Sequence, residues 1–254
     1  KVMGLQAYEN HIQDFVDSWP ALERDQIPIL INWIQSLQID TSDKNQEWLD
    51  IIASVFKVAG ILQKRLFKIH PKDSPIIYSG GIALNVNWNR ELLDEGYDLR
   101  IEPHVYDGGL SIGCLRWLAE QYDVDLKIEN FPYIQGDESP STPPDSSTIE
   151  KVAQLLSDGK IVGWYQGHGE LGPRALGNRS ILMRPDIPDG KDIINQKVKG
   201  REWWRPFGAS VKQDKASEYF ELDDSPYMLY TAKVLNSDLH SSTHGDGTCR
   251  HQTV

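Results

Sequence analysis

The sequence predicts an α/β protein, because two of its regions combine short apolar strand candidates with loops and amphipathic helices. Residues 75–125 form one strand–loop–helix series, and residues 149–165 begin another. A segment rich in proline and small polar residues, 138–145, lies between them and cannot form a regular element. The 254 residues suit one large domain or two smaller ones. We therefore expect two domains joined by a linker over residues 126–148.

The expected elements follow in order from a helical first 70 residues. There, a helix with its N-cap at Asp43 carries an apolar stripe that ends at Leu66. The region before the linker then alternates strands with helices, namely a strand over 75–78, a helix over 83–93, a strand over 99–101 and a helix over 110–122. Beyond the linker, a helix over 149–156 leads into a strand over 161–165, and residues 250–254 resemble a strand cut short.

Composition and charge exclude several classes of protein. A net charge of −11 argues against general nucleic-acid binding, which needs a basic face. Residues 151–212 differ, with 11 Lys/Arg against 6 Asp/Glu, and this excess predicts a pocket for a small anion. Cys114 and Cys249 are too few for a disulfide framework or a cysteine zinc site, and indicate reduced thiols in a cytoplasmic protein. No apolar run approaches the roughly 20 residues of a membrane helix, and no signal peptide is visible.

Residues 166–182 carry the strongest chemical pattern in the chain. Four glycines and a proline within 166–177 exclude a helix or a central strand, and they let backbone amides converge on a ligand. Arg174 and Arg179 lie close by, and an arginine fork binds phosphate or carboxylate oxygens at two points. The alternative is a glycine-rich surface loop whose arginines are merely solvated.

A second cationic segment follows at residues 195–209. Four cations within nine positions are interleaved with Trp203, Trp204 and Phe207. This mixture predicts a pocket wall in which cations lie over apolar surface. The alternatives are a solvated basic stretch and a nucleic-acid patch, and the acidic remainder of the chain argues against the latter.

Three runs, in a fixed order, resemble a known family. They are GPRALGNRSIL at 172–182, K-x-R-E-x-x-R-P-F at 199–207 and THGDGTCRHQTV at 243–254. Together they resemble the O-carbamoyltransferases, which include nodulation-factor enzymes and enzymes that decorate antibiotics. The runs KVMGL, SGGIALN, YDGGLSIG and FPYIQG extend the resemblance over nearly the whole chain.

The resemblance implies a more specific fold. Residues 1–125 would form the C-terminal lobe of an actin-like ATPase (ASKHA) module, of the kind found in threonylcarbamoyl-transfer proteins. Residues 126–148 would be the linker, and residues 149–254 an incomplete YrdC-like α/β domain. By the same resemblance, the first lobe of one module and the last part of the other lie outside this sequence.

The resemblance also implies a reaction. Carbamoyl phosphate and ATP give a carbamoyl-adenylate, and a hydroxyl of a small-molecule natural product or sugar then attacks the carbamoyl carbon. The alternatives are a threonylcarbamoyl-adenylate synthase-like protein and a non-catalytic nucleotide-binding regulator. The implied partner is the hydroxyl acceptor, with no nucleic acid and no membrane, and the oligomeric state stays open.

Carbamoyl phosphate and ATP are both anions, so the implied pocket must be cationic and rich in amides. We expect six residues to converge on it: Gly172, Arg174, Arg179, Lys199, Arg201 and Arg205. Glu170 either orients an arginine or forms a structural ion pair. His168 stands where relatives often have arginine, and a neutral imidazole supplies less charge.

Four further residues receive roles from the resemblance. Gly80 and Gly81 follow a strand and precede a helix, where backbone amides approach a nucleotide closely. Asp107 matches a catalytic aspartate that joins two histidines, absent from this sequence, on a divalent metal (Fe or Mg). It is expected to face the same cleft as the two glycines; alternatively, it is a turn aspartate. His244, in the last run with Asp246, is expected to be catalytic; alternatively, this turn is an ordinary surface loop.

Overall fold

The computed structural model describes residues 16–17, 27–36, 46–136 and 143–254. The chain divides into two compact units, each built from separate stretches of sequence. Unit 1 comprises residues 1–74, 191–206 and 244–247, and unit 2 comprises residues 75–190, 207–243 and 248–254.

Unit 1 is built around the long helix α3 (Gln46–Phe67), which follows α2 (Ile27–Ser36). Leu49 and Ile52, on one face of α3, pack with Trp204 into a core cluster. The helix predicted for this region is confirmed, whereas Leu66 is exposed and does not belong to the buried stripe. The predicted N-cap, Asp43, lies outside the described residues.

A π-helical turn, η4 (Asn195–Lys199), continues the short helix α7 (Gly190–Ile194). It ends at Gly200, whose φ of 54° is left-handed and suits glycine. Such π-turns are frequent at functional sites. This turn introduces the loop that carries Arg201 and Arg205.

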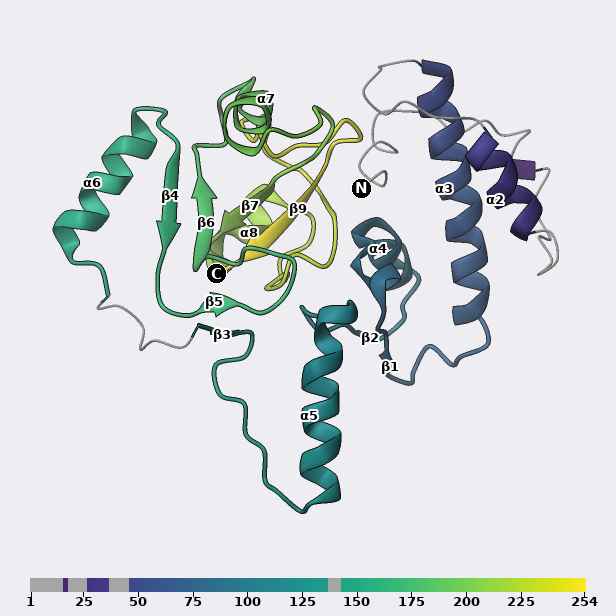
Figure 1. Ribbon diagram of the computed structural model, residues 1–254. Helices are drawn as coiled ribbons and strands as arrows, with labels where there is room; N and C mark the ends of the chain where they lie inside the picture. Colours follow the sequence, from purple (N-terminus) through teal and green to yellow (C-terminus); the bar gives the residue numbers. More distant parts are fainter. Residues whose placement is uncertain (1–15, 18–26, 37–45, 137–142) are drawn as a thin grey trace. The chain divides into compact units, whose positions relative to one another are not determined.

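Unit 2 begins with a strand–turn–helix–strand series. Strands β1 (Ile76–Ile77) and β2 (Leu99–Arg100), both labelled in Figure 1, pair in parallel. Between them lie the 3-10 turn η2 (Gly81–Leu84) and the helix α4 (Val86–Asp94). Asn85 caps α4, because its side-chain oxygen accepts a hydrogen bond from the backbone N–H of Trp88 at 3.3 Å. The helix therefore starts three residues later than predicted.

The next part of unit 2 differs from the predicted linker. The turn η3 (Asp107–Gly109) enters α5 (Leu110–Gln121), as predicted. Strand β3 (Tyr133–Gln135) then pairs antiparallel with β5 (Gly169–Glu170), although it lies within the segment predicted as linker. The proline-rich residues that suggested a break begin only after this strand.

Residues on both sides of the predicted linker belong to unit 2, so the boundary between the two units does not lie at the linker. One physical reason is that β3, inside the predicted linker, is bound to β5 through backbone hydrogen bonds. Another is that Gly172, beyond the linker, lies close to the backbone of Pro103, before it. The assignment of residues 1–125 and 149–254 to actin-like and YrdC-like modules stays a prediction.

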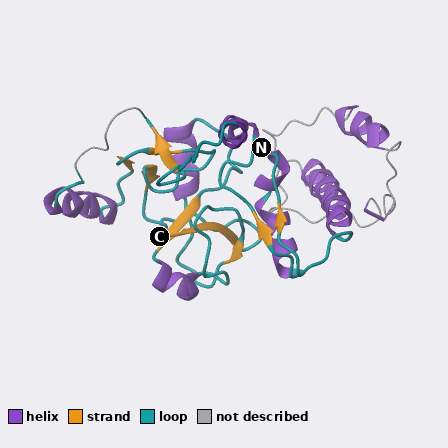
Figure 2. Cartoon of the chain, turned by 90° about the horizontal axis from the view of Figure 1, so that it is seen from below, coloured by secondary structure: helices purple, strands orange, loops and turns teal. Residues whose placement is uncertain are grey.

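The remaining elements of unit 2 are short. Helix α6 (Ser146–Ser157) is capped by Asp145, and strands β4 (Val162–Tyr165) and β6 (Arg179–Leu182) pair antiparallel. A three-stranded sheet has the order β7-β9-β8, with bounds Gly208–Val211, Thr248–Thr253 and Ala232–Lys233. Two short turns, η5 (Gln213–Lys215) and α8 (Ala216–Tyr219), follow β7. Figure 2 distinguishes these strands from the helices and loops.

Phe220, Ala232, Leu239 and Cys249 form a buried cluster beside the three-stranded sheet. The structure is thus mixed α/β with sheets of two or three strands, which confirms the predicted class. None of the described helices is both long and apolar enough to cross a membrane.

His251 on β9 makes the stability of unit 2 sensitive to acid. Its ring stacks on Phe220 with centroids 4.2 Å apart, and burial lowers its pKa from 6.5 to about 4. The unfolded chain therefore binds the proton first, so stability present above pH 6.5 is lost as the pH falls towards 4. The full loss is about 3 kcal/mol.

We expect His251→Phe to remove this part of the pH dependence, since phenylalanine fills the stacked position without titrating. Urea unfolding at pH 7 and pH 5 measures it for both proteins. An unchanged difference between the two pH values in the variant would assign the acid sensitivity to other groups.

Candidate functional site

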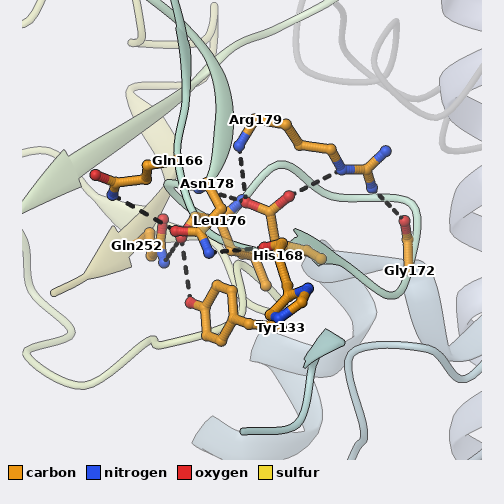
Figure 3. A network of polar contacts seen from close by, with 9 residues as sticks. Tyr133, Gln166, His168, Gly172, Leu176, Asn178, Arg179 and Gln252 are labelled. Carbon is orange, nitrogen blue, oxygen red and sulfur yellow. Dashed lines mark hydrogen bonds and ion pairs between the residues drawn. The ribbon is translucent and has the colours of Figure 1, made fainter. Parts of the chain in front are cut away.

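The carboxylate of Glu170 accepts four hydrogen bonds from the glycine-rich loop, and Figure 3 labels their donors Leu176, Asn178 and Arg179. This side chain is fully buried. Its Oε1 accepts hydrogen bonds from the backbone N–H groups of Leu176 at 2.8 Å, Asn178 at 2.7 Å and Arg179 at 3.3 Å. Its Oε2 accepts one from the Arg179 Nε at 2.8 Å. Because a buried charge must be paired, residues 171–179 fold around this carboxylate.

Two opposing effects set the pKa of Glu170. Burial raises it, but the backbone bonds from Leu176 and Asn178 and the Arg179 guanidinium outweigh burial and lower the pKa overall. The carboxylate is therefore ionised at neutral pH. Glu170 forms an ion pair with Arg179, and the same contact orients the guanidinium, so the two alternatives left open by the sequence do not exclude each other.

Neighbouring elements of unit 2 hold the same loop from outside. The carbonyl oxygen of Leu176 accepts hydrogen bonds from the Tyr133 hydroxyl at 3.2 Å and the Gln252 Nε2 at 2.9 Å. Asn178 Nδ2 donates to the carbonyl of His168 at 2.8 Å (Figure 3). The loop is thus a fixed structure, and the alternative of a merely solvated surface loop does not describe it.

The two arginines of this loop differ in what they contact. Besides the bond to Glu170, Arg179 donates from Nη2 to the carbonyl of Gly172 at 2.9 Å, and 39% of its side chain is exposed. Arg179 therefore stabilises the loop, while part of its side chain remains accessible to solvent.

Arg174 is the less compensated cation. Its Nη2 reaches the carbonyl of Leu84 at 3.4 Å, and its Nε is buried without a hydrogen bond. Burial, and secondly the charge of Arg250, lower its pKa to about 9, so it remains a cation at neutral pH. Within the described part of the chain, no carboxylate pairs with it. Since an uncompensated buried charge is costly, an anion at this position would stabilise it.

In unit 1, Asn195 organises the second cationic segment. Its side chain is fully buried and accepts a hydrogen bond from the Arg201 Nε at 2.6 Å, while Nδ2 donates to the carbonyl of Arg205 at 3.0 Å. Arg201 also donates to the carbonyl of Pro206 at 3.3 Å. Sequence reasoning missed Asn195, and its signal was a polar residue directly after Ile193 and Ile194.

The charges of this segment are only partly buried. Burial, and secondly Arg205, lower the pKa of Arg201. Arg205 lies 3.6 Å from the Glu202 carboxylate, and Lys199 is exposed. Trp204 is buried in the core cluster with Leu49 and Ile52, so the prediction that it forms a pocket wall is wrong. The amphipathic helix α3 needs an apolar partner, and Trp204 supplies it.

The structure assigns the six predicted anion ligands to both units. Gly172, Arg174 and Arg179 belong to unit 2, whereas Lys199, Arg201 and Arg205 belong to unit 1. Their convergence on one pocket stays a prediction.

A cavity of about 580 Å³ in unit 2 contains two of the upstream candidates, Gly80 and Asp107, among its lining residues. Gly80 has a φ of 104°, which favours glycine, and its N–H donates to the carbonyl of Val105 at 2.8 Å. Gly81 begins η2. The nucleotide-binding role of the two glycines stays a prediction.

The described residues supply only one of the ligands that the family resemblance implies for the metal, because its two histidines would lie outside this sequence. Asp107 is exposed at the cavity, and the described residues contain no group of three or more His, Cys, Asp or Glu side chains that could hold a metal ion. One carboxylate is too small a ligand set to hold a metal ion by itself, so the metal-binding role of Asp107 stays a prediction. His244 and Asp246 lie in a turn of unit 1, where the Gly247 N–H donates to the carbonyl of His244 at 3.0 Å. The catalytic roles of Asp107 and His244 stay predictions.

Comparisons with known proteins agree with the sequence motifs. The family model described as Carbamoyltransferase C-terminus matches residues 153–254. Nodulation protein NolO of Bradyrhizobium diazoefficiens is 34% identical over 238 residues, covering 82% of this chain and 43% of the relative. Nodulation protein NolNO of Sinorhizobium fredii is 35% identical over 204 residues, covering 69% of this chain and 30% of the relative.

A relative with a chemically explicit name is the 3'-hydroxymethylcephem-O-carbamoyltransferase of Streptomyces clavuligerus. It is 32% identical over 215 residues, which cover 77% of this chain and 41% of that protein. The chain thus spans less than half the length of these curated relatives.

Proposed function

This chain belongs to the O-carbamoyltransferase family, and from that membership we propose that the protein containing it transfers a carbamoyl group to the hydroxyl of a small molecule. The name of the cephem relative specifies such an acceptor, a hydroxymethyl group on a small ring system. The proposed donor is carbamoyl phosphate, which ATP activates as a carbamoyl-adenylate.

The proposed reaction balances in three steps. Water releases inorganic phosphate from carbamoyl phosphate and leaves carbamate. A carbamate oxygen attacks the α-phosphorus of ATP, and pyrophosphate leaves. The acceptor oxygen then attacks the carbamoyl carbon of the adenylate, AMP leaves with the electron pair of the broken C–O bond, and the hydroxyl proton passes to a base.

The observation that carries this proposal is the environment of Arg174. The guanidinium of Arg174 is partly buried, feels the positive charge of Arg250 and makes one long hydrogen bond to a backbone carbonyl. This position therefore favours a bound anion. Glu170 already orders the loop that contains Arg174, so binding a phosphate there would cost little additional conformational entropy. We propose that this loop binds the phosphate of carbamoyl phosphate.

The family resemblance extends the proposal to the modules. We propose that residues 149–254 belong to a YrdC-like module that forms the adenylate. Residues 1–125 would belong to an actin-like module that binds the adenylate and the acceptor. The parallel β1–β2 pair, with Gly80 in the turn that follows its first strand, is the kind of place where open α/β sheets bind ligands.

Replacing Arg174 by alanine in the full-length protein tests the proposed anion site. We expect a tenfold to hundredfold weaker affinity for carbamoyl phosphate, or about 1.5–3 kcal/mol, the scale of a charged hydrogen bond. Thermal stability should not fall, because the change removes a poorly compensated cation. Isothermal titration calorimetry measures the affinity.

Arg184→Ala is the matched control for this experiment. Arg184 comes from the same region of sequence but is already paired with Asp186 through its Nε at 2.6 Å. Its loss should leave the affinity within about twofold, a change of well under 1 kcal/mol. Equal affinities for the wild type and Arg174→Ala would show that the loop is structural and that the anion site lies elsewhere.

A further inference from the structure

We propose that His104 is the base that takes the proton from the attacking hydroxyl, in the cavity that it lines together with Asp107. This inference rests on the proposed function and adds a residue and a step to it. Neither the sequence motifs nor the comparisons assign a role to this histidine.

The cavity is large enough for a substrate and has the chemistry of a nucleotide site. Its volume is about 580 Å³, within the range of pockets that bind small molecules. Apolar and aromatic walls such as Ile77 and Phe131 suit a base and a ring, and Arg100 and Arg116 supply cations for a phosphate. The same walls would hold an adenylate.

The imidazole ring of His104 is held by a ring contact, but one of its nitrogens lacks a hydrogen bond. Its ring packs edge-on against Phe131, with centroids 4.7 Å apart and planes at 74°. Its Nδ1 is buried and makes no hydrogen bond with the described residues. A structural histidine at such a position normally has both ring nitrogens satisfied. Because His104 also lines the cavity, a ligand or water bound there would supply the hydrogen-bond partner that this nitrogen lacks.

Two glycines pack closely against the backbone of His104 and of the residue before it. A Cβ on Gly109 would lie 2.4 Å from the His104 carbonyl oxygen, and one on Gly172 would lie 2.7 Å from the Pro103 carbonyl oxygen. Both glycines therefore allow two backbone segments to lie closer together than any side chain at these positions would permit. His104 is thus held between the cavity and the loop that contains Arg174, so one residue adjoins both candidate sites of unit 2.

Histidine suits the proton transfer better than the other groups at this cavity. The titratable or charged side chains that line it with His104 are Tyr78, Arg100, Glu102, Tyr106, Asp107 and Arg116. Arginine is always protonated, tyrosine is rarely ionised at neutral pH and an exposed carboxylate is a weak base there. Imidazole gains and loses a proton in this range. In the proposed step the acceptor O–H proton moves to His104 as the new C–O bond forms and AMP departs.

The test separates the two half-reactions in the full-length protein, with water as the probe nucleophile. Pyrophosphate release reports adenylate formation, and AMP release in a single turnover reports attack on the carbamoyl carbon. We expect His104→Gln to slow AMP release by about a hundredfold or more, the usual contribution of a general base, with pyrophosphate release within about threefold of wild type. The acid side of the pH profile of AMP release should also disappear in this variant.

His240→Gln, at an exposed histidine outside the cavity, is the matched control and should leave both half-reactions unchanged. If His104→Gln does not fold, Phe131→Leu keeps the imidazole but removes its ring contact, and should slow only AMP release. AMP release at the wild-type rate in the folded variants would overturn the role of His104. A wild-type protein that releases no pyrophosphate with carbamoyl phosphate and ATP would instead overturn the proposed function.

Discussion

Replacing Glu170 by alanine is expected to lower the free energy of unfolding by about 3–5 kcal/mol, the cost of breaking a buried ion pair by removing one partner. The change leaves the backbone N–H groups of Leu176 and Asn178 without their acceptor inside the protein. Urea unfolding measures the loss. Amide hydrogen exchange should show that these two N–H groups lose protection before the rest of unit 2 does.

Glu218→Ala is the control, because Glu218 is an exposed residue whose carboxylate is paired with Lys215. Surface pairs of this kind contribute little, so the control should unfold like the wild type. The pKa of Glu170 is lowered by folding, so its contribution is present at neutral pH and is lost as the pH falls below about 4.5. Equal stabilities for the Glu170 variant and the control would contradict the central place given to this carboxylate.

Replacing Gly172 by alanine is expected to cost about 2–5 kcal/mol, from backbone strain and from steric overlap together. Its φ is 128°, and the added Cβ would lie 2.7 Å from the backbone oxygen of Pro103. Gly177→Ala is a closely matched control in the same loop. Its φ is 112°, but a Cβ there meets nothing within 4 Å.

The difference between the two alanine variants isolates the contact between the glycine-rich loop and the Pro103–His104 segment. We expect Gly172→Ala to be less stable than Gly177→Ala by about 1–3 kcal/mol in urea unfolding. Equal stabilities would mean that the loop does not pack against this segment. The packed geometry on which His104 depends would then be absent.

Local patterns predicted most of the helices and the first strands correctly. The apolar pair Ile76–Ile77 and the helix from Leu110 are visible in sequence because neighbouring residues determine them. Strand β3 was missed because its partner, β5, lies more than 30 residues away and neither strand is apolar along its length. Its residues were assigned to the linker for the same reason.

The candidate site shows the same limit. The sequence treats Arg174 and Arg179 as equivalent, yet Arg179 is bound to Glu170 while Arg174 has no carboxylate partner among the described residues. The interleaved cations and aromatics predicted a pocket wall, but Trp204 completes the core beside α3. Whether a side chain is buried in the core or lines a pocket depends on its packing with segments distant in sequence. The spacing of residues along the chain does not specify that packing.

Formation of the adenylate is the central claim, and pyrophosphate release by the full-length protein tests it most directly. We expect ATP to yield pyrophosphate only when carbamoyl phosphate is present. At subsaturating carbamoyl phosphate, Arg174→Ala should slow the reaction by about tenfold to a hundredfold, in line with its lost affinity, while Arg184→Ala does not. Pyrophosphate release that is absent from the wild type, independent of carbamoyl phosphate or unaffected by Arg174→Ala would contradict it.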